Sequence, residues 1–222
     1  MELYPLYLTI KVSLTATVFA ALIGLAVALL MARKDFFGKG FLDVLIMQPL
    51  VIPPTVLGYY LLAAFGRSSF LGRFLEDSLG IEVVFTWKGA VVASLVSSLP
   101  LFIKPARAAI EGVGRELEDA ARLLGKTELQ VLWTVTLPLA WRGIAAGVVM
   151  AFARATGEFG ATLMVAGNIP GKTQTLPIAI YDAVQMGDDL TANALVLIIT
   201  VFSFSVLYLV GLFTRGRFWH GG

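Results

Sequence analysis

The sequence predicts an all-α integral membrane protein with about five transmembrane helices, and three observations support this. Apolar residues make up 58% of the 222 positions and charged residues only 14%, against roughly 45–50% and about 25% in soluble domains. The apolar residues form runs of about 20, the length of helix that crosses the hydrocarbon of a bilayer. Lysine and arginine collect in alternate loops between these runs. We therefore expect one membrane domain over residues 1–222.

Five segments have the length and hydropathy of a membrane-spanning helix. The second contains three prolines, the third is the shortest, and the fourth contains two charged residues, Arg154 and Glu158. Only Lys11 precedes most of the first run, which is long enough to span, so we expect it to be retained rather than cleaved as a signal peptide. The predicted spans are approximately 8–32, 41–65, 89–110, 143–165 and 190–213.

The distribution of basic residues predicts the orientation, because cytoplasmic loops of membrane proteins are rich in lysine and arginine. The loops after the first and third spans, together with the end of the third span and the C-terminal end, carry eleven of these residues, and the opposite side carries five. The richer side should be cytoplasmic. We therefore expect the N-terminus outside the cell, the C-terminus in the cytoplasm, and a multi-pass protein of the cytoplasmic (inner) membrane.

The composition excludes several kinds of chemistry. The chain has no cysteine and a single histidine, His220, so thiolate metal sites, cysteine nucleophiles and most histidine-based catalysis are absent. The net charge of +2 does not indicate nucleic-acid binding. No GxxxxGK[ST] phosphate-binding loop occurs. We expect no catalytic residue, metal or cofactor, and a protein that is not itself an enzyme.

The most informative stretch lies between the third and fourth spans, Arg115–Pro138, and is called the elbow below. Its first part, 115–124, has a helical pattern of charged and small apolar residues. Gly125 should break this helix, because glycine accepts backbone angles that other residues avoid. A second short helix should begin at Thr127 as N-cap and end before Pro138. The pattern alone leaves two interpretations open, an amphipathic surface helix or a docking element for a cytoplasmic partner.

The elbow resembles the "EAA" loop of the inner-membrane permease subunits of ABC importers. That loop reads Glu-Ala-Ala, three residues, Gly, nine residues, Ile, one residue, Leu-Pro. Aspartate replaces glutamate here, with Glu118 beside it, and valine replaces isoleucine, so which carboxylate faces a partner stays open. The matching residues are Asp119, Ala120, Ala121, Gly125, Val135, Leu137 and Pro138.

The resemblance implies the type I fold of ABC importer permeases. It also implies that the elbow, with Glu118 included, couples the chain to a separate ATP-hydrolysing subunit, of which two should dock on the cytoplasmic side. A binding protein that delivers the substrate should dock outside, where residues 167–174 form part of a long loop. Five spans are few to enclose a pathway, so we expect a homodimer, the commonest closed assembly.

Three further segments resemble the molybdate branch of these permeases, residues 48–66, 98–113 and 153–181. Sulfate and tungstate permeases share part of this likeness, notably the Gly-Glu-Phe-Gly-Ala-Thr run at 157–162. The resemblance therefore implies an importer that moves molybdate by alternating access, with tungstate or sulfate as alternatives. A membrane-embedded enzyme and an ion-driven secondary transporter are the rival classes. The first lacks a nucleophile–base pair, and the second calls for inverted repeats and coupling-ion carboxylates.

Polar residues inside the spans are the candidates for a translocation pathway or gate. Arg154 and Glu158 stand four apart, so we expect them on one helix face, either as an ion pair that holds helices together or as part of the pathway. An oxyanion in a dry pore needs hydrogen-bond donors, although each hydroxyl could instead serve helix packing. These hydroxyl candidates are Thr55, Ser94, Ser97, Ser98, Thr156 and Thr162.

Overall fold

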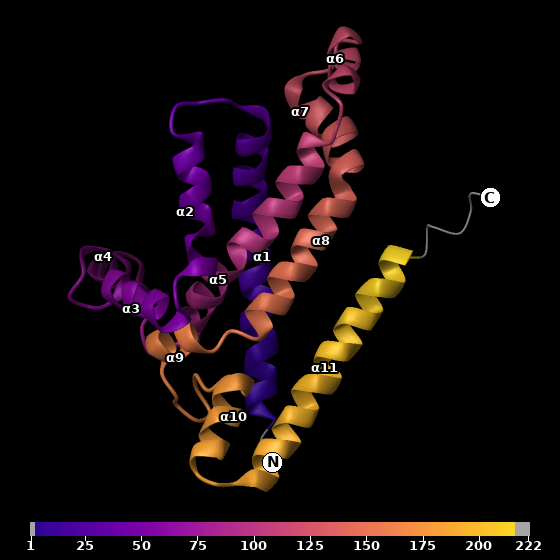
Figure 1. Cartoon of the computed structure of the whole chain (residues 1–222). Helices are drawn as coiled ribbons and strands as arrows, with labels where there is room; N and C mark the ends of the chain where they lie inside the picture. Colours follow the sequence, from indigo (N-terminus) through magenta and orange to yellow (C-terminus); the bar gives the residue numbers. More distant parts are fainter. Residues whose placement is uncertain (1–2, 216–222) are drawn as a thin grey trace.

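The structure, a computed structural model, describes residues 3–215 as helices joined by short loops (Figure 1). Four of these helices are long and apolar enough to cross a membrane, and a bent pair makes a fifth if it is counted as one span. They are α1 (Tyr4–Arg33), α5 (Trp87–Glu111), the helical run Glu128–Thr156, of which α8 (Leu137–Thr156) is the main part, and α11 (Asp189–Arg215). At a rise of 1.5 Å per residue, the 30 residues of α1 extend about 45 Å.

The remaining elements are short and lie at the ends or on one side of the bundle (Figure 1). They are α2 (Lys39–Val51), α3 (Pro54–Phe65), α4 (Phe70–Leu79), α6 (Arg115–Leu123), α7 (Glu128–Val131), the π-helical turn η1 (Leu132–Thr136), α9 (Gly160–Ala166) and α10 (Leu176–Gln185).

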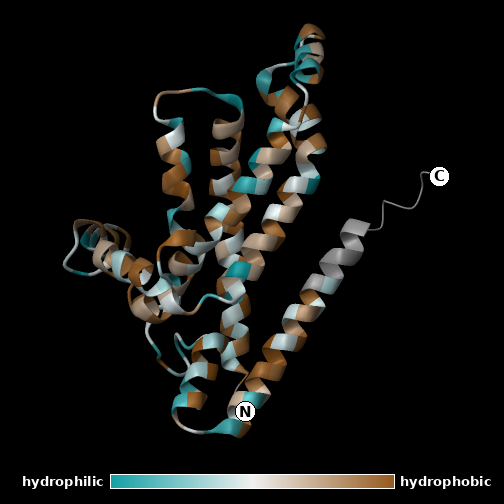
Figure 2. Ribbon diagram, in the orientation of Figure 1, coloured by the Kyte–Doolittle hydropathy of each residue, from teal (hydrophilic) through white to brown (hydrophobic). Residues whose placement is uncertain are grey.

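The helices define two ends of the bundle. The elbow elements α6 and α7 project beyond one end, which also carries the turn between α1 and α2, and α10 lies at the other end with the start of α1 (Figure 1). Figure 2 shows hydrophilic residues concentrated in the loops at both ends and in α6 and α7, with hydrophobic residues along the long helices. We call these the elbow end and the opposite end.

The helix expected over 41–65 is broken in the structure. α2 ends at Val51 and α3 begins at Pro54, and the two axes meet at 114°. Ile52 and Pro53 between them are extended, because a proline disfavours helix in the residue before it. Pro49, by contrast, is accommodated inside α2. The expected single span is therefore two helices, with α3 turned to the side of the bundle.

The helix expected over 143–165 also differs. α8 begins earlier, at Leu137, and ends at Thr156, where Gly157 caps it. A short break precedes α9, which begins at Gly160. The second half of the expected span is therefore a separate short helix. The other boundaries agree with the expected ones to within a few residues.

Close contact of α1, α5 and α8 forms the core of the bundle. Phe102 of α5 is fully buried and lies between Gly24 of α1 and Gly147 of α8. A Cβ atom on Gly24 would overlap the Phe102 ring, and one on Gly147 would lie 2.8 Å from the Phe102 carbonyl oxygen. Small residues let helix backbones approach closely where lipid provides no hydrophobic driving force between helices. The two glycines therefore permit the three-helix packing.

Candidate functional site

The elbow begins with α6, a strongly amphipathic helix of nine residues. Acidic residues occupy its first turn and Arg122 its last. Charges in these positions stabilise a helix, because they interact favourably with the helix dipole at both ends. Gly125 then takes a left-handed φ of +83°. Its N–H donates to the Arg122 carbonyl at 2.9 Å, and the Lys126 N–H donates to the Ala121 carbonyl at 3.2 Å, which is the Schellman pattern. The predicted break at Gly125 is present.

The second part of the elbow begins as expected but ends differently. Thr127 caps α7 in a capping box with Gln130. The predicted stop before Pro138 is wrong, because the chain continues through the π turn η1 into α8 without leaving the helical conformation. In η1 the Leu137 N–H reaches back to the Leu132 carbonyl. Pro138 then lies at the second residue of α8, directly after the π turn.

The two adjacent carboxylates of the elbow have different surroundings. Glu118 is buried and accepts hydrogen bonds from Arg33 Nη2 at 2.7 Å and from Thr136 Oγ1 at 2.6 Å. The side chain of Asp119 is 66% exposed and pairs with Arg122 Nη1 at 2.6 Å. Of the two carboxylates, the one at the surface is therefore Asp119, which stands at the glutamate position of the loop that the elbow resembles.

Arg122 also links the two helices of the elbow. Its Nε and Nη2 donate to the two carboxylate oxygens of Glu128 at 2.6 and 3.0 Å. This bidentate pair raises the pKa of the Arg122 guanidinium and lowers the pKa of the Glu128 carboxyl. The geometry of a planar fork fixes the angle between α6 and α7 more closely than a single contact does.

The elbow exposes several large apolar side chains. Ala120 is exposed while Ala121 is buried, and Leu137 and Pro138 lie farther along, at the start of α8. Contiguous exposed apolar residues mark interaction sites. The large exposed side chains here, with exposures of 54–89%, belong to Leu117, Leu123, Leu124, Leu129 and Trp133.

Arg154 and Glu158 form an ion pair at 2.6 Å between Nη2 and Oε2. They are not on one helix face, because α8 ends at Thr156 and Glu158 lies in the break before α9. The other oxygen of Glu158 accepts the Ala161 N–H at 3.0 Å, in the first turn of α9. The side chain of Glu158 is 1% exposed and that of Arg154 is 27% exposed. The pair thus joins α8 to α9 across the break.

The candidate hydroxyls occupy two kinds of place. Thr55, at the start of α3, is exposed. The others are buried inside the chain, where Ser97, Ser98 and Thr156 donate to backbone carbonyls of their own helices. Ser94 and Thr162 find no hydrogen-bond partner for their buried oxygens among the described residues. Burial between helices is typical of packing.

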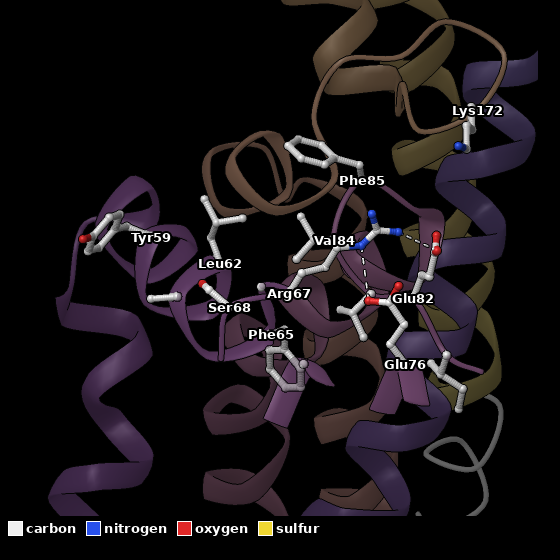
Figure 3. Close-up of a pocket in the computed structure, with 15 residues that line it drawn as sticks. Tyr59, Leu62, Phe65, Arg67, Ser68, Glu76, Glu82, Val84, Phe85 and Lys172 are labelled. Carbon is white, nitrogen blue, oxygen red and sulfur yellow. Dashed lines mark hydrogen bonds and ion pairs between the residues drawn. The ribbon is translucent and has the colours of Figure 1, made fainter. Parts of the chain in front are cut away.

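A cavity of about 610 Å³ lies on the side of the bundle, beside α3 and α4, and is drawn in Figure 3. Arg67 points between Glu76 and Glu82 there, with N–O distances of 3.2 and 2.8 Å. Lys172 reaches the cavity from the long loop. Two carboxylates neutralise Arg67, so this cavity is poorly suited to hold an anion.

Sequence reasoning missed Arg33 and Thr136 as partners of Glu118. Arg33 was counted only as a basic residue that sets orientation, and Thr136 was passed over. No local signal connects them, because Arg33 and Glu118 are 85 positions apart in the chain. The elbow residues themselves were predicted because they are consecutive.

Comparison with solved structures identifies the class of protein that this fold defines. The crystal structure of a bacterial ABC transporter involved in the import of the acidic polysaccharide alginate superposes with a TM-score of 0.78 at 14% identity, over 97% of this chain and 79% of that chain. An inward-facing conformation of the MetNI methionine ABC transporter gives 0.71 at 16% identity, over 96% and 94%. The chain has the fold of an ABC importer permease, which confirms the predicted fold class.

The sequence then identifies the family. Residues 20–218 match the binding-protein-dependent transport system inner membrane component, and the chain belongs to this family. The molybdenum transport system permease protein ModB of Escherichia coli (strain K12) is 47% identical over 83% of this chain and 80% of the relative. That of Azotobacter vinelandii is 36% identical over 98% and 95%. The predicted family is confirmed, and the chain is a multi-pass transport component of the inner membrane.

Proposed function

We propose that this chain is the membrane-spanning subunit of an ATP-driven importer of molybdate. The carrying observation is its 36–47% identity, over most of its length, to permeases named for molybdenum transport. Tungstate and sulfate are the alternative substrates, because neither the buried pair nor the hydroxyls of this chain form a site that distinguishes one tetrahedral oxyanion from another.

The elbow is the proposed docking element for two ATP-hydrolysing subunits in the cytoplasm. Asp119 and Ala120 are exposed on α6, and the large apolar side chains around them would be covered by a partner. Gly125 orients α7 relative to α6, and Leu137 and Pro138 connect the elbow to α8. This assignment places the elbow end of the bundle in the cytoplasm, with the C-terminus on that side and the N-terminus outside.

Two copies of the chain would enclose the pathway. Within one copy α2 has no buried residue, and α3 exposes Val56, Tyr59 and Tyr60. A broken helix with free backbone groups is tolerated in a membrane where protein or water covers it. A second copy related by a two-fold axis would cover this side of the bundle. Thr55 at the break would then face the pathway.

The transport cycle follows from this arrangement. A loaded binding protein docks outside, near the exposed turn at residues 168–172. Closure of the ATPase subunits brings the two elbows together and opens the outer side, and hydrolysis restores the inward-facing state, as alternating access requires. The Arg154–Glu158 pair holds α8 to α9 during these movements and makes no contact with the oxyanion.

Reconstitution tests this proposal. The chain would be co-expressed with an ATP-hydrolysing subunit from the same genome, purified as a complex and placed in vesicles with the binding protein. We expect ATP-dependent accumulation of molybdate, reduced by competing tungstate and, more weakly, by sulfate. A complex that binds ATP and transports none of the three anions would contradict the proposal.

A further inference from the structure

Three separate elements meet at the carboxylate of Glu118. Arg33 ends α1, Glu118 lies in the first half of α6, and Thr136 ends η1. The Arg33 Nη2 and the Thr136 hydroxyl both donate to the same oxygen, Glu118 Oε1, at 2.7 and 2.6 Å. Arg33 also donates to the carbonyl of Val113 at 3.4 Å. We call Arg33, Glu118 and Thr136 the carboxylate node.

The node joins α1 to α6 through charged side chains. Beside it lies a cavity of about 560 Å³ lined by residues that include Leu29, Arg115, Glu118 and Thr136. The side chain of Glu118 is only 5% exposed and that of Arg33 is 21% exposed. Within the described residues, α6 otherwise packs mainly on α7 and η1. The charged contact is therefore the principal direct tie between α6 and α1.

A buried ion pair is a poor device for stability alone, because well-packed apolar residues of similar volume usually serve as well or better. What the node adds is direction. The two donors come from different segments, Arg33 at the end of α1 and Thr136 next to α8. A displacement of Glu118 would therefore pull on both helices. The wide π turn η1 ends at Thr136, so the node adjoins α8 directly, and such turns occur frequently at functional sites.

We propose that Glu118 is a positioning residue that makes the elbow move as one body with the ends of α1 and α8. A displacement of the elbow would then reach both helices rather than being absorbed by bending at Gly125 or at residues 112–114. This inference rests on the proposed function, since it requires that an ATP-hydrolysing subunit moves the elbow.

The test compares variants in the complex of this chain with its ATPase subunit, reconstituted in vesicles with the binding protein. The single change Glu118→Gln leaves Arg33 without a counter-ion, so it tests folding as much as coupling. The decisive variant is Arg33→Gln/Glu118→Gln, which removes both charges together and leaves no unpaired buried charge. The control is Asp35→Asn/Lys39→Gln, which removes an exposed ion pair of 2.7 Å at the same end of the bundle.

The measured quantity is molybdate transported per ATP hydrolysed. We expect the double variant to assemble with the ATPase and hydrolyse ATP, while this ratio falls roughly 5- to 150-fold, the usual range of coupling between sites. Thr136→Val should lower the ratio in the same direction, and the Asp35→Asn/Lys39→Gln control should leave it unchanged.

Three outcomes are informative. If the double variant transported as much molybdate per ATP as the unmodified chain, the positioning role would be overturned, and the node would serve only to pack the helices. A double variant that assembles but loses coupling supports it. If the unmodified chain itself fails to assemble with the ATPase or to transport, the proposed function fails instead, and the node with it.

Discussion

Glu118 and Asp119 are neighbours in the chain but lie on different sides of α6, with side-chain exposures of 5% and 66%. One carboxylate binds two helices of its own chain and the other remains at the surface. In a helix, successive residues are about 100° apart, since 3.6 residues complete a turn. The spacing of the loop motif along the chain therefore does not show which of the two carboxylates is buried. The exposures of the two side chains distinguish them.

The elbow should lose its partner when its turn is changed. Gly125→Trp is expected to reduce co-purification of the ATPase subunit at least tenfold, because the left-handed φ of +83° is strained for any side chain and the indole would stand in the proposed contact. No atom lies within 4 Å of the position of the new Cβ, so the new Cβ itself has open space around it. The measurement is the amount of ATPase retained on tagged chain.

Gly187→Trp is the matched control for this change. Gly187 follows α10 with a φ of +71° and open space around it. It makes the same pair of hydrogen bonds, from its own N–H to Val184 and from Asp188 to Ala183. The backbone cost is therefore similar, at the opposite end of the molecule. Equal loss of the ATPase in both variants would show a general folding defect rather than a docking role.

The core should not accept side chains where α5 meets α8. Gly147→Val would press Cβ against the Phe102 carbonyl oxygen, 2.8 Å away. We expect a cost of about 1–3 kcal/mol from overpacking, or a lower Tm by several degrees in detergent. Gly40→Val in α2 is the control, because nothing lies within 4 Å of its Cβ position. An unchanged Tm for Gly147→Val would mean that the helices are not packed as described.

Disruption of the Arg154–Glu158 pair should lower the free energy of unfolding and leave the selectivity of transport unchanged. Glu158→Gln leaves a guanidinium facing a neutral amide, and we expect a loss of about 1–3 kcal/mol in the free energy of unfolding. Arg154→Gln/Glu158→Gln should recover most of that loss, since no unpaired charge remains. Thermal unfolding and molybdate uptake are measured on both variants.

Glu111→Gln provides the comparison for that pair. Glu111 pairs with Arg107 at 2.7 Å, in a position where 42% of its side chain is exposed, and exposed pairs contribute little. We expect its Tm to stay near the unmodified value. If Glu158→Gln instead kept its stability and changed the selectivity of transport, the pair would belong to the pathway.

The link between α6 and α7 should weaken only in acid. The hydrogen bond from Arg122 lowers the pKa of Glu128 in the folded chain. A depressed carboxyl pKa stabilises the fold above the unfolded pKa of about 4.3, and the contribution is lost as the pH falls through the lower folded value. Amide exchange over residues 126–130, corrected for intrinsic rates, should show constant protection from pH 8 to 5 and less below about pH 4.

Glu128→Gln should remove this dependence on pH, because the neutral amide does not titrate. Its protection at neutral pH should resemble that of the unmodified chain in acid. Loss of protection in the unmodified chain between pH 8 and pH 6 would count against Glu128 as the titrating group.

Long apolar runs were enough to predict the approximate place of the long helices, because the bilayer requires a fixed length of helix. The break at residues 52–53 was visible as two prolines, yet composition does not give the angle between α2 and α3. The end of α8 was less visible, because Thr156 and Gly157 occur inside helices as well as at their ends. Boundaries of this kind depend on neighbouring helices.

By itself, the sequence determined the class, the family loop and the positions of its motif residues, since these depend on composition and on spacing along the chain. Only the tertiary structure decided that Glu118 points inward to Arg33 and Thr136, that the elbow runs on through a π turn into α8, and that most candidate hydroxyls lie buried between helices. The physical reason is that burial and pairing depend on groups from distant segments meeting in space, and spacing within one segment carries no information about them.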